Sequence, residues 1–406
     1  MSENYNGNGN YILEYCNLYS KDENTDEELV WDLVPHFVEA SLFESITSPT
    51  MSGYIAVIDA FNANELLPLY GGERIELSFY TAGNEEKPIE YIGYVFKVSP
   101  KHRLTEHSTG YKISFCSEAS ILSKRTFTHM GMTSTISQMV SDIYSNHLLG
   151  RTRKLLETSS TKGVLSYTFG ATEPLDAISV LSRRASGTDS TVGYLFYENN
   201  QTFKFESIQQ MYQRDIVASY TNRQAGVYEE TSQRNIEQFE SIQGINIDEE
   251  NSFMDRMMDG IHGSNFGHFN LMTKTFTNFH YRKNDDFDPS KSLGSIPDKK
   301  FVDDGNDTQS IAYESSDPLI WFDEARGIMK LIESETFRAK VSVFGDSNLK
   351  SGDLIRLSVP NWNVDQENVK TGFDGSVLIS SIRHTITPKT YAQVLGVRKD
   401  AYEELV

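Results

Sequence analysis

Two histidines close together are the residues whose types and spacing most suggest chemistry. His262 and His268 flank the segment GSNFG at residues 263–267, and Asp255 and Asp259 lie just upstream. Imidazole and carboxylate groups are metal ligands, but a metal centre needs three or four of them at compatible positions. Glycine-rich turns with isolated histidines are common. We therefore interpret the segment as a turn, and we predict no metal ligand, no cofactor and no cofactor-binding residue.

Acidic pairs are the second candidate for chemistry. They occur at residues 248–250, 285–286 and 303–304. Glycoside hydrolysis uses two carboxyl groups that face each other in a cleft and have shifted pKa values. The acidic pairs of this chain lie in polar segments that we expect to be exposed. They therefore predict a solvated surface.

Other catalytic signatures lack a supporting context. Arg183 and Arg184, in the segment SRRASG, could suggest a phosphate site, but they fall where a helix is expected to end and where cations favour the helix dipole. No nucleophile elbow, zinc-protease motif, phosphate-binding loop or dinucleotide fingerprint occurs before or after a suitable element. We predict no catalytic residues and no enzyme.

Charge and cysteine content exclude further classes. The 406-residue chain has 57 acidic and 37 basic residues and a formal net charge of −20. Gripping nucleic-acid phosphates needs clustered Lys and Arg, so specific nucleic-acid binding is not expected. Cys16 and Cys116 are too few for a disulfide framework or a metal knuckle, and we expect both to be reduced. Neither a transmembrane helix nor a secretory signal is indicated.

Short β-branched and aromatic runs, separated by turn residues, dominate both ends of the chain. Examples are residues 54–61, 74–81, 91–99 and 111–118, and later 336–345, 353–360, 375–387 and 390–401. Such spacing is typical of antiparallel sandwiches or barrels. Helical periodicity predicts helices over 133–148, with Thr133 or Ser134 as the N-cap, over 172–185 with Thr172 as a cap candidate, and from Asp317–Pro318 to about residue 335. The predicted fold class is α+β, mainly β.

A ten-residue frame occurs twice. LYGGERIELS at residues 69–78 matches LKSGDLIRLS at residues 349–358 when Gly72 is aligned with Gly352. The following strands keep the same order in both places, although two hairpins with glycine turns can also look alike by coincidence. We expect Gly352 to adopt a positive φ. The frame positions predicted to matter structurally are Leu69, Gly72, Ile75, Leu77, Leu349, Gly352, Ile355 and Leu357.

The repeat predicts the domain organisation. Two similar small antiparallel β-barrels flank an α+β middle region. The first barrel takes residues 1–118, of which 1–28 are expected to be irregular. The middle region takes 119–221 and 257–324, and the second barrel takes 222–256 and 325–406. Residues 283–310 are polar and are expected to form a mobile surface excursion.

Three segments make the chain resemble the baseplate (tail) hub proteins of contractile-tail bacteriophages of the T-even type. They are YLFYENNQTFKFESIQQMY at 194–212, FMDRMMDGIHGSNFGHFNLMTKTF at 253–276, and FRAKVSVFGDSNLKSGDLIRLSVP at 337–360. The resemblance covers nearly the whole chain in order. The polar excursion at 283–310 departs from it, because it is longer than the motif-bearing parts suggest.

The resemblance implies a structural protein of the virion tail, assembled in the host cytoplasm. It implies a homotrimer whose paired barrels form a pseudo-hexameric ring between a sixfold tail tube and a threefold central spike. Expected partners are the chain itself, the spike protein, the tube or tube-initiator protein and baseplate wedge proteins. DNA is expected only in transit through the lumen, without specific binding, and no membrane insertion is expected.

Three questions remain open at this stage. A tail-associated cell-wall hydrolase or cell-surface-binding module could also be rich in β-structure. The net charge of −20 either lines the lumen and repels passing DNA or keeps the surface soluble. The methionines Met254, Met257, Met258 and Met272 are expected to fill a core, with a partner-facing patch as the alternative.

Overall fold

Alternating buried and exposed side chains account for most of the strands. In the computed structural model, strand β8 (Thr109–Ser117) and strand β19 (Phe337–Phe344) both bury every second residue, as expected for strands with one face on a core. The structure describes residues 9–21, 28–60, 69–105, 108–151, 153–222, 239–248, 258–295, 308–314, 318–359 and 374–401. Within these ranges, no helix has the length and apolar character needed to cross a membrane.

Most strands belong to one 14-stranded sheet that contains two groups. We call these groups the first strand set and the second strand set. Each surrounds a hydrophobic core of its own. The first set comprises β1 (Tyr11–Lys21), β2 (Glu28–Asp32), β3 (Phe37–Ser45), β4 (Ser52–Asp59), β5 (Arg74–Thr81), β6 (Ile89–Val98), β7 (His102–Arg103) and β8, with a 3₁₀ turn at Val34–His36. The second set comprises β14 (Ile216–Thr221), β15 (Gly244–Asp248), β19, β20 (Leu354–Ser358), β21 (Gly375–Ile386) and β22 (Tyr391–Lys399).

An α+β unit follows the first set in the sequence. Its helices pack with aromatic strands around a third core. Its elements are α2 (Glu118–Arg125), β9 (Thr128–Ser134), α3 (Ile136–Ile143), a π-helical turn (Tyr144–Leu148), β10 (Leu156–Thr158), β11 (Leu165–Thr172), α4 (Pro174–Arg184), β12 (Tyr194–Glu198), β13 (Phe203–Ser207) and α5 (Ile208–Met211).

A second α+β unit contains a three-stranded sheet and the longest helix. Helix α9 (Pro318–Glu333) packs on this sheet through Trp321 and Phe322, whose rings contact Phe266. The remaining elements are β16 (Gly263–Asn270), β17 (Thr275–Arg282), β18 (Thr308–Glu314), α8 (Lys283–Asp286) and a 3₁₀ turn (Pro289–Lys291).

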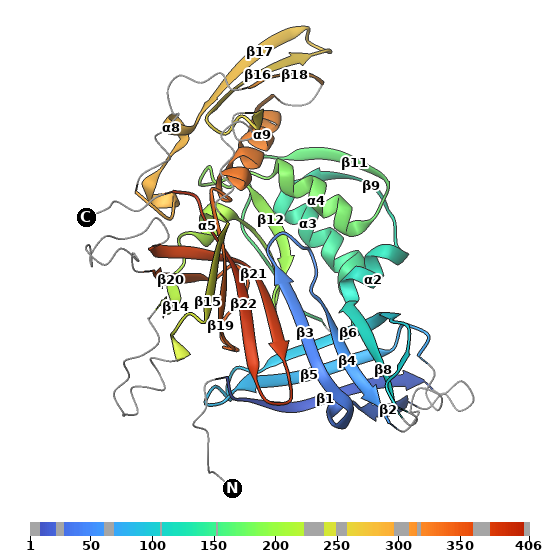
Figure 1. Cartoon of the computed structure of the whole chain (residues 1–406). Coiled ribbons are helices and arrows are strands. Elements are labelled where there is room, and N and C mark those ends of the chain that lie inside the picture. The colour runs from blue at the N-terminus through green and yellow to red at the C-terminus, as the bar shows by residue number, and fades with distance from the viewer. Residues whose placement is uncertain are drawn as a thin grey trace, which may run out of the picture.

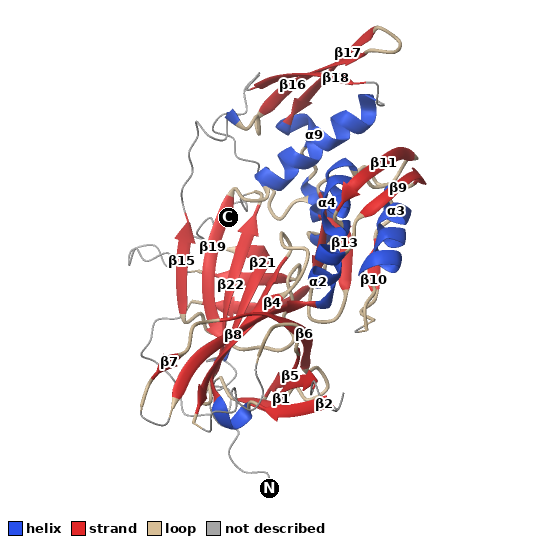
Figure 2. Ribbon diagram, turned by 90° about the vertical axis from the view of Figure 1, so that its right-hand side faces the viewer, coloured by secondary structure: helices blue, strands red, loops and turns tan. Residues whose placement is uncertain are grey.

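The second strand set and the first α+β unit lie side by side between the two ends of the molecule. Figure 1 shows the first strand set at the bottom, the second set beside and above it, and the sheet β16–β18 at the opposite end. In Figure 2 helix α9 lies between that sheet and helix α4. The mainly β, α+β class predicted from the sequence is therefore confirmed.

The strand pairings differ from two separate barrels. Among the described residues, no pairing closes either set into a barrel, and β3 of the first set pairs directly with β21 of the second. The hydrogen bond from the Ile242 amide to the Thr221 carbonyl joins the segment before β15 to the end of β14, whereas the bond from the Leu33 amide to the Cys16 carbonyl extends the β1–β2 ladder. The two sets therefore share one continuous, strongly curved sheet.

Several boundaries predicted from the sequence need correction. Strand β1 lies within residues 1–28, which were expected to be irregular. Strand β14 pairs with β20, so the second set begins before residue 222, and α9 continues across the expected boundary at residue 324. The boundaries at residues 222 and 324 were predicted at the wrong places because β14 and α9 contact residues far away in the sequence.

Local features also differ. The Thr135 side chain, not Thr133 or Ser134, caps α3, and Glu173 precedes α4 without a side-chain cap. Residues 283–295 of the expected excursion contain α8 and a 3₁₀ turn, and they bury Lys283 and Leu293. Of the rest, residues 296–307 lie outside the described ranges, and 308–310 begin β18.

Candidate assembly surfaces

Two glycine turns have the same hydrogen bonds in the two strand sets. Gly72 has φ +94° and Gly352 has φ +88°, so Gly352 takes the positive φ expected for it. The Gly72 amide donates to the Val95 carbonyl at 2.7 Å, and the Gly352 amide donates to the Ile379 carbonyl at 2.8 Å. Each turn thus fixes the start of one strand against a partner strand.

The acidic residue after each glycine has the same role. Glu73 accepts the amide of Tyr70 at 2.7 Å, and Asp353 accepts the amide of Lys350 at 3.0 Å. The two turns therefore agree in backbone conformation, in strand contact and in the side chain that closes them.

The apolar positions of the two frames lie in separate cores. In the first core Ile75 and Leu77 are buried and Leu69 is half-buried, and in the second core Leu349, Ile355 and Leu357 are buried. The structure does not bring the eight frame residues together at one place. They support two separate strand sets and form no common pocket.

Strand order extends the correspondence beyond the frame. The first set has the order β3-β4-β8-β6-β5-β1, and the second has the order β15-β19-β22-β21-β20-β14. Five neighbouring pairs thus correspond, and four have the same antiparallel sense. The fifth differs, because β1 is antiparallel to β5 whereas β14 is parallel to β20.

A bulge lies at the same place in both orders. The register of β6 on β8 shifts between Val95 and Lys97, and the register of β21 on β22 shifts between Ile379 and Ser381. Val95 and Ile379 are also the residues that bind the two glycine turns. The bulge and the turn therefore occupy equivalent positions in the two sets.

The junction between the sets is an antiparallel ladder. It joins Ala40–Ser45 of β3 to Ser381–Ile386 of β21. Its buried face has a polar cluster, in which His384 Nε2 lies 3.3 Å from Glu44 Oε1 and His384 Nδ1 lies 2.7 Å from the Tyr391 hydroxyl. Gln393 binds the same hydroxyl at 2.9 Å. Main-chain pairing and buried polar contacts together fix the register of the junction.

Charge is distributed unequally across this junction. Strand β3 supplies Glu39 and Glu44, whereas β21 supplies Arg383 and His384. Arg383 and Glu39 approach to 3.5 Å on the exposed face. The end strand of one set is thus acidic where the facing strand of the other is basic.

The Gly352 turn also contacts the first α+β unit. Arg214 donates to the Gly352 carbonyl at 2.6 Å and forms an ion pair with Glu206. The Tyr197 hydroxyl donates to Glu206 at 2.6 Å. A Cβ at Gly352 would lie 2.4 Å from the Tyr197 hydroxyl, whereas a Cβ at Gly72 would meet no atom within 4 Å. The second turn alone is therefore a junction between two units.

Buried charges connect the second α+β unit, which contains α9 and the β16–β18 sheet, to the end of β22. Glu333 of α9 lies 3.3 Å from Lys283 and 2.9 Å from Lys330, and all three side chains are almost fully buried. The paired lysines outweigh the effect of burial and lower the pKa of Glu333. Nearby, Asp400 accepts the Leu293 amide at 2.9 Å.

Asp400 should make stability depend on pH. Burial, with the charge of Glu333 as a second cause, raises the pKa of Asp400 from 3.8 to about 6. Because the folded state holds the proton more tightly, this group's stabilisation is complete below about pH 4 and is lost as pH rises through about 6. Asp400→Asn should therefore raise the free energy of unfolding at about pH 8 by about 2–3 kcal/mol and change it little near pH 4.

Urea unfolding of both proteins at several pH values measures this difference. An equal difference between the variant and the parent at about pH 4 and about pH 8 would contradict the assignment. Asp374→Asn is a suitable control, because the Asp374 carboxylate also accepts a main-chain amide, that of Val359 at 2.6 Å, and Asp374 lies just before β21.

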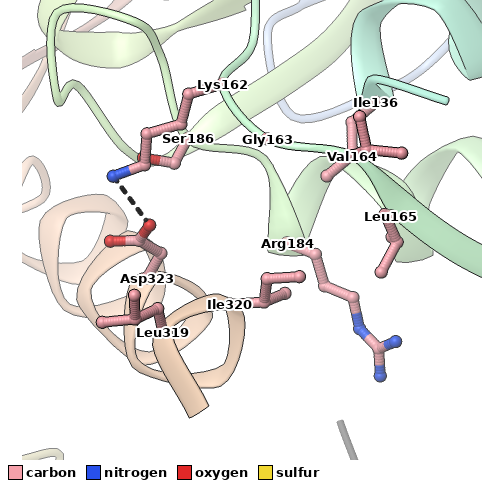
Figure 3. A pocket seen from close by; sticks show the side chains of 10 residues that line it. All are labelled: Ile136, Lys162, Gly163, Val164, Leu165, Arg184, Ser186, Leu319, Ile320 and Asp323. Atoms are coloured by element: carbon pink, nitrogen blue, oxygen red, sulfur yellow. Dashed lines mark ion pairs between the residues drawn. The ribbon is translucent and has the colours of Figure 1, made fainter. Parts of the chain in front are cut away.

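A cleft of about 320 Å³ separates the first α+β unit from the first turns of α9. Figure 3 shows Val164, Leu319 and Ile320 on its walls, with the ion pair between Lys162 and Asp323 at 3.0 Å along one side. A second ion pair joins Arg184 to Glu324 at 3.2 Å. The cleft is apolar, and its charged residues are engaged in joining the two units.

The histidines and arginines that were considered for chemistry lie in or next to regular elements of the fold. Residues 263–267 lie in strand β16 and do not form the expected turn, and the side chains of His262, just before the strand, and His268, within it, are buried. No group of three or more potential metal ligands occurs in the part of the chain that the structure describes. Arg183 and Arg184 are in the last turn of α4, as predicted.

Two of the four methionines, Met258 and Met272, do not lie in the expected core. Met258 is 69% exposed and Met272 is 81% exposed, and Met254 and Met257 lie outside the described residues. Met272 is part of a loop closed by Asn270, whose side chain accepts the amides of Met272 and Thr273. An exposed apolar loop therefore lies at the tip of the β16–β17 hairpin.

Sequence analysis missed the residues of the β3–β21 junction. Glu44, His384 and Gln393 are polar residues at buried positions of alternating strands. An inward-facing polar residue in such a strand is the signal that could have identified them.

Comparison with known proteins identifies the fold. No family model and no curated protein sequence matches the chain. Among solved structures, a tail protein from Neisseria meningitidis MC58 is similar with a TM-score of 0.57 and 12% identity, over 97% of this chain and 99% of that one. The 43 kDa tail protein of prophage MuSo2 from Shewanella oneidensis has a TM-score of 0.54 and 10% identity, over 95% and 98% of the two chains.

A chain of the Francisella PdpA–VgrG complex is also similar. Its TM-score is 0.52 and its identity 10%, over 99% of this chain and 55% of that one. At such low identity these likenesses concern the fold. The chain therefore shares its fold with a Neisseria meningitidis tail protein and with a prophage tail protein along nearly its whole length.

Proposed function

We propose that this chain is a structural protein of a contractile phage tail, the hub of its baseplate, and that it assembles as a homotrimer. The observation that carries the proposal is the equivalence of the two strand sets, which agree in strand order, bulge position and glycine-turn hydrogen bonds. We infer that they are two copies of one ancestral set. The eight frame residues then have structural roles in each copy.

Two equivalent sets in one chain change the symmetry of an oligomer. Three chains present six sets, and a closed arrangement of six similar sets has near-sixfold symmetry although only a threefold axis is exact. Such a ring can match a sixfold tail tube on one side and a threefold spike on the other. The duplicated strand set would thus let the protein join a sixfold tube to a threefold spike.

We infer that the remaining units meet a second partner. The β16–β18 sheet lies at the opposite end of the molecule from the first strand set (Figure 1). In the assembled trimer three such units would surround the axis below the ring and could hold a central spike. The exposed apolar side chains of Leu271 and Met272 at the hairpin tip are suited to such a contact.

The proposed role involves no catalysis and no cofactor. DNA would pass through the ring during ejection, and a chain with a net charge of −20 suits a wall to which phosphates do not adhere. The protein would assemble in the host cytoplasm with the spike, the tube and wedge proteins, and would then be part of the virion.

Electron microscopy of the purified protein along the ring axis tests this proposal. It determines the number of chains and the number of lobes separately. Three chains with six lobes are expected, and the outcomes are given at the end of the Discussion.

A further inference from the structure

The cleft between the two α+β units has exposed apolar side chains on both walls. Val164, just before β11, is 66% exposed, and Leu319, in the first turn of α9, is 60% exposed. The two residues lie on opposite walls of about 320 Å³ of open space (Figure 3). Burial of such apolar surface is favourable, so approach of the two walls would be stabilising. The cleft therefore has a bias towards closing.

Helix α9 crosses the first α+β unit at a contact between two glycines. Gly327 lies in the second half of α9, and a Cβ there would be 3.2 Å from the Gly193 nitrogen and 3.6 Å from the Arg183 carbonyl oxygen. Gly193 has φ +74°, and its own Cβ would be 3.4 Å from the Gly327 carbonyl oxygen. Neither residue contributes a side chain that would interlock the two units at this point. Because glycine also weakens a helix interior, Gly327 is where α9 bends most readily.

The part of α9 beyond Gly327 is held firmly. Leu331 packs against a core shared by the second strand set and the first α+β unit. Just after the helix, the Ser334 hydroxyl accepts a hydrogen bond from Arg398 of β22 at 3.3 Å. Movement at Gly327 is therefore a movement of the N-terminal part of α9. Leu319 lies eight residues before this point, about 12 Å along the helix axis, and moves furthest.

Two ion pairs fix the spacing between the N-terminal part of α9 and the first α+β unit. Lys162 pairs with Asp323 at 3.0 Å. Arg184 pairs with Glu324 at 3.2 Å. All four side chains keep part of their surface in water, so water and salt screen the two pairs. Ile320 already rests against the core of the first α+β unit, so the movement that closes the cleft is small.

We propose that the N-terminal part of α9 turns at the Gly193–Gly327 contact and closes the cleft. Leu319 then covers Val164, and the two ion pairs hold the open position that the structure shows. The β16–β18 sheet moves with α9 because the two pack together, so closure changes the position of the β16–β17 hairpin tip. This movement lies within one chain and goes beyond the proposed ring.

Disulfide trapping within one chain tests closure. The full chain with Val164→Cys and Leu319→Cys, treated with oxidised glutathione, should form a bond between the two new thiols. Intact mass after alkylation of the free thiols counts this bond in the 46.0 kDa chain, and Cys16 and Cys116 are common to all variants. Val164→Cys with Ile328→Cys is the control, because Ile328 is exposed on α9 but lies outside the cleft, and it should form no bond. Absence of the bond in the first variant would overturn the proposal.

Removal of both ion pairs should speed the trapping. Lys162→Gln with Glu324→Gln, added to the two-cysteine variant, should raise the rate of bond formation about two- to thirtyfold, because each screened pair contributes little. About 0.5 M NaCl should raise the rate while the pairs are present and not after their removal. Lys124→Gln is the matched control, because it removes an exposed pair with Glu173 within the first α+β unit, and it should leave the rate unchanged. Equal rates with and without the two pairs would contradict their role in holding the cleft open.

Gly327→Ala should slow the trapping. The new Cβ would press on the Gly193 backbone and would stiffen the helix, so most of the bond formation should be lost. Gly170→Ala is the matched control, because its Cβ would meet nothing within 4 Å, and it should trap as fast as the parent. Equal rates in the two glycine variants would overturn the assignment of the turning point. All these measurements are made within one chain, so they stand or fall separately from the ring.

Discussion

Replacing Gly352 by alanine is expected to lower the free energy of unfolding by about 3–5 kcal/mol. The first cause is backbone strain, because φ is +88° and a residue with a Cβ occupies that region at a cost of about 1–2 kcal/mol. The second cause is steric. The added Cβ would lie 2.4 Å from the Tyr197 hydroxyl and 3.0 Å from Arg214 Nη1.

Relief of that clash must disturb a partly buried network. Arg214 connects the Gly352 carbonyl to Glu206, and Tyr197 donates to the same carboxylate. Moving either side chain leaves charged or polar groups without their partners, which costs about 1–3 kcal/mol for each buried group. The contact between the second strand set and the first α+β unit is therefore weakened together with the turn.

Gly72→Ala is the matched control. Gly72 has φ +94° and the same strand hydrogen bond, but its Cβ would meet nothing within 4 Å. Its expected cost is the strain alone, about 1–2 kcal/mol. Chemical denaturation of both variants measures the difference, and equal losses would show that the Tyr197–Arg214 contact does not make the second turn special.

Glu333→Gln is expected to destabilise the protein by about 3–5 kcal/mol. Glu333 is the carboxylate between Lys283 and Lys330, and the side chains of these residues are 1%, 0% and 7% exposed. Glutamine keeps the shape but removes the charge, so two ammonium groups remain buried without the carboxylate that lies between them. Unfolding should begin in the β16–β18 unit, because Lys283 and α9 belong to it.

The neighbouring residue Glu335 supplies a control for this charge. Its side chain is 41% exposed, and it pairs with Arg398 at 3.2 Å and with Arg338 at 3.6 Å. Glu335→Gln should cost less, about 1–2 kcal/mol, because water screens the half-exposed Glu335 carboxylate and the buried Arg398 keeps the Ser334 hydroxyl as a partner. Thermal unfolding measures the stability of both variants, and hydrogen exchange of the β17 amides shows whether the β16–β18 unit unfolds first. A similar loss in both would contradict the role of the buried cluster.

Local patterns predicted the elements whose signals are short in sequence. The glycine frame identified both turns, because a positive φ and an acidic residue one position later are encoded within a few residues. The apolar positions of the two frames lie in or beside the two cores, Ile75, Leu77, Ile355 and Leu357 within strands and Leu69 and Leu349 just before the turns. Helix α4 was predicted from Pro174 and its apolar stripe.

Long-range pairing could not be predicted in the same way. Whether Glu44 is buried depends on β21, which is more than three hundred residues away, and β14 gives no sign in its sequence that it pairs with β20. Of the contacts between the two strand sets and their neighbours, the sequence therefore predicted only the two repeated glycine turns. The junction that explains how the sets adjoin follows from pairings that only the three-dimensional structure shows.

The central claim is that three chains form a ring of six similar strand sets. Class averages of the purified protein, viewed along the ring axis by electron microscopy, test it most directly. The account predicts a closed ring with threefold symmetry and six lobes around one central opening. A ring with three lobes, a true sixfold ring of six chains, or isolated single chains at every concentration would contradict it.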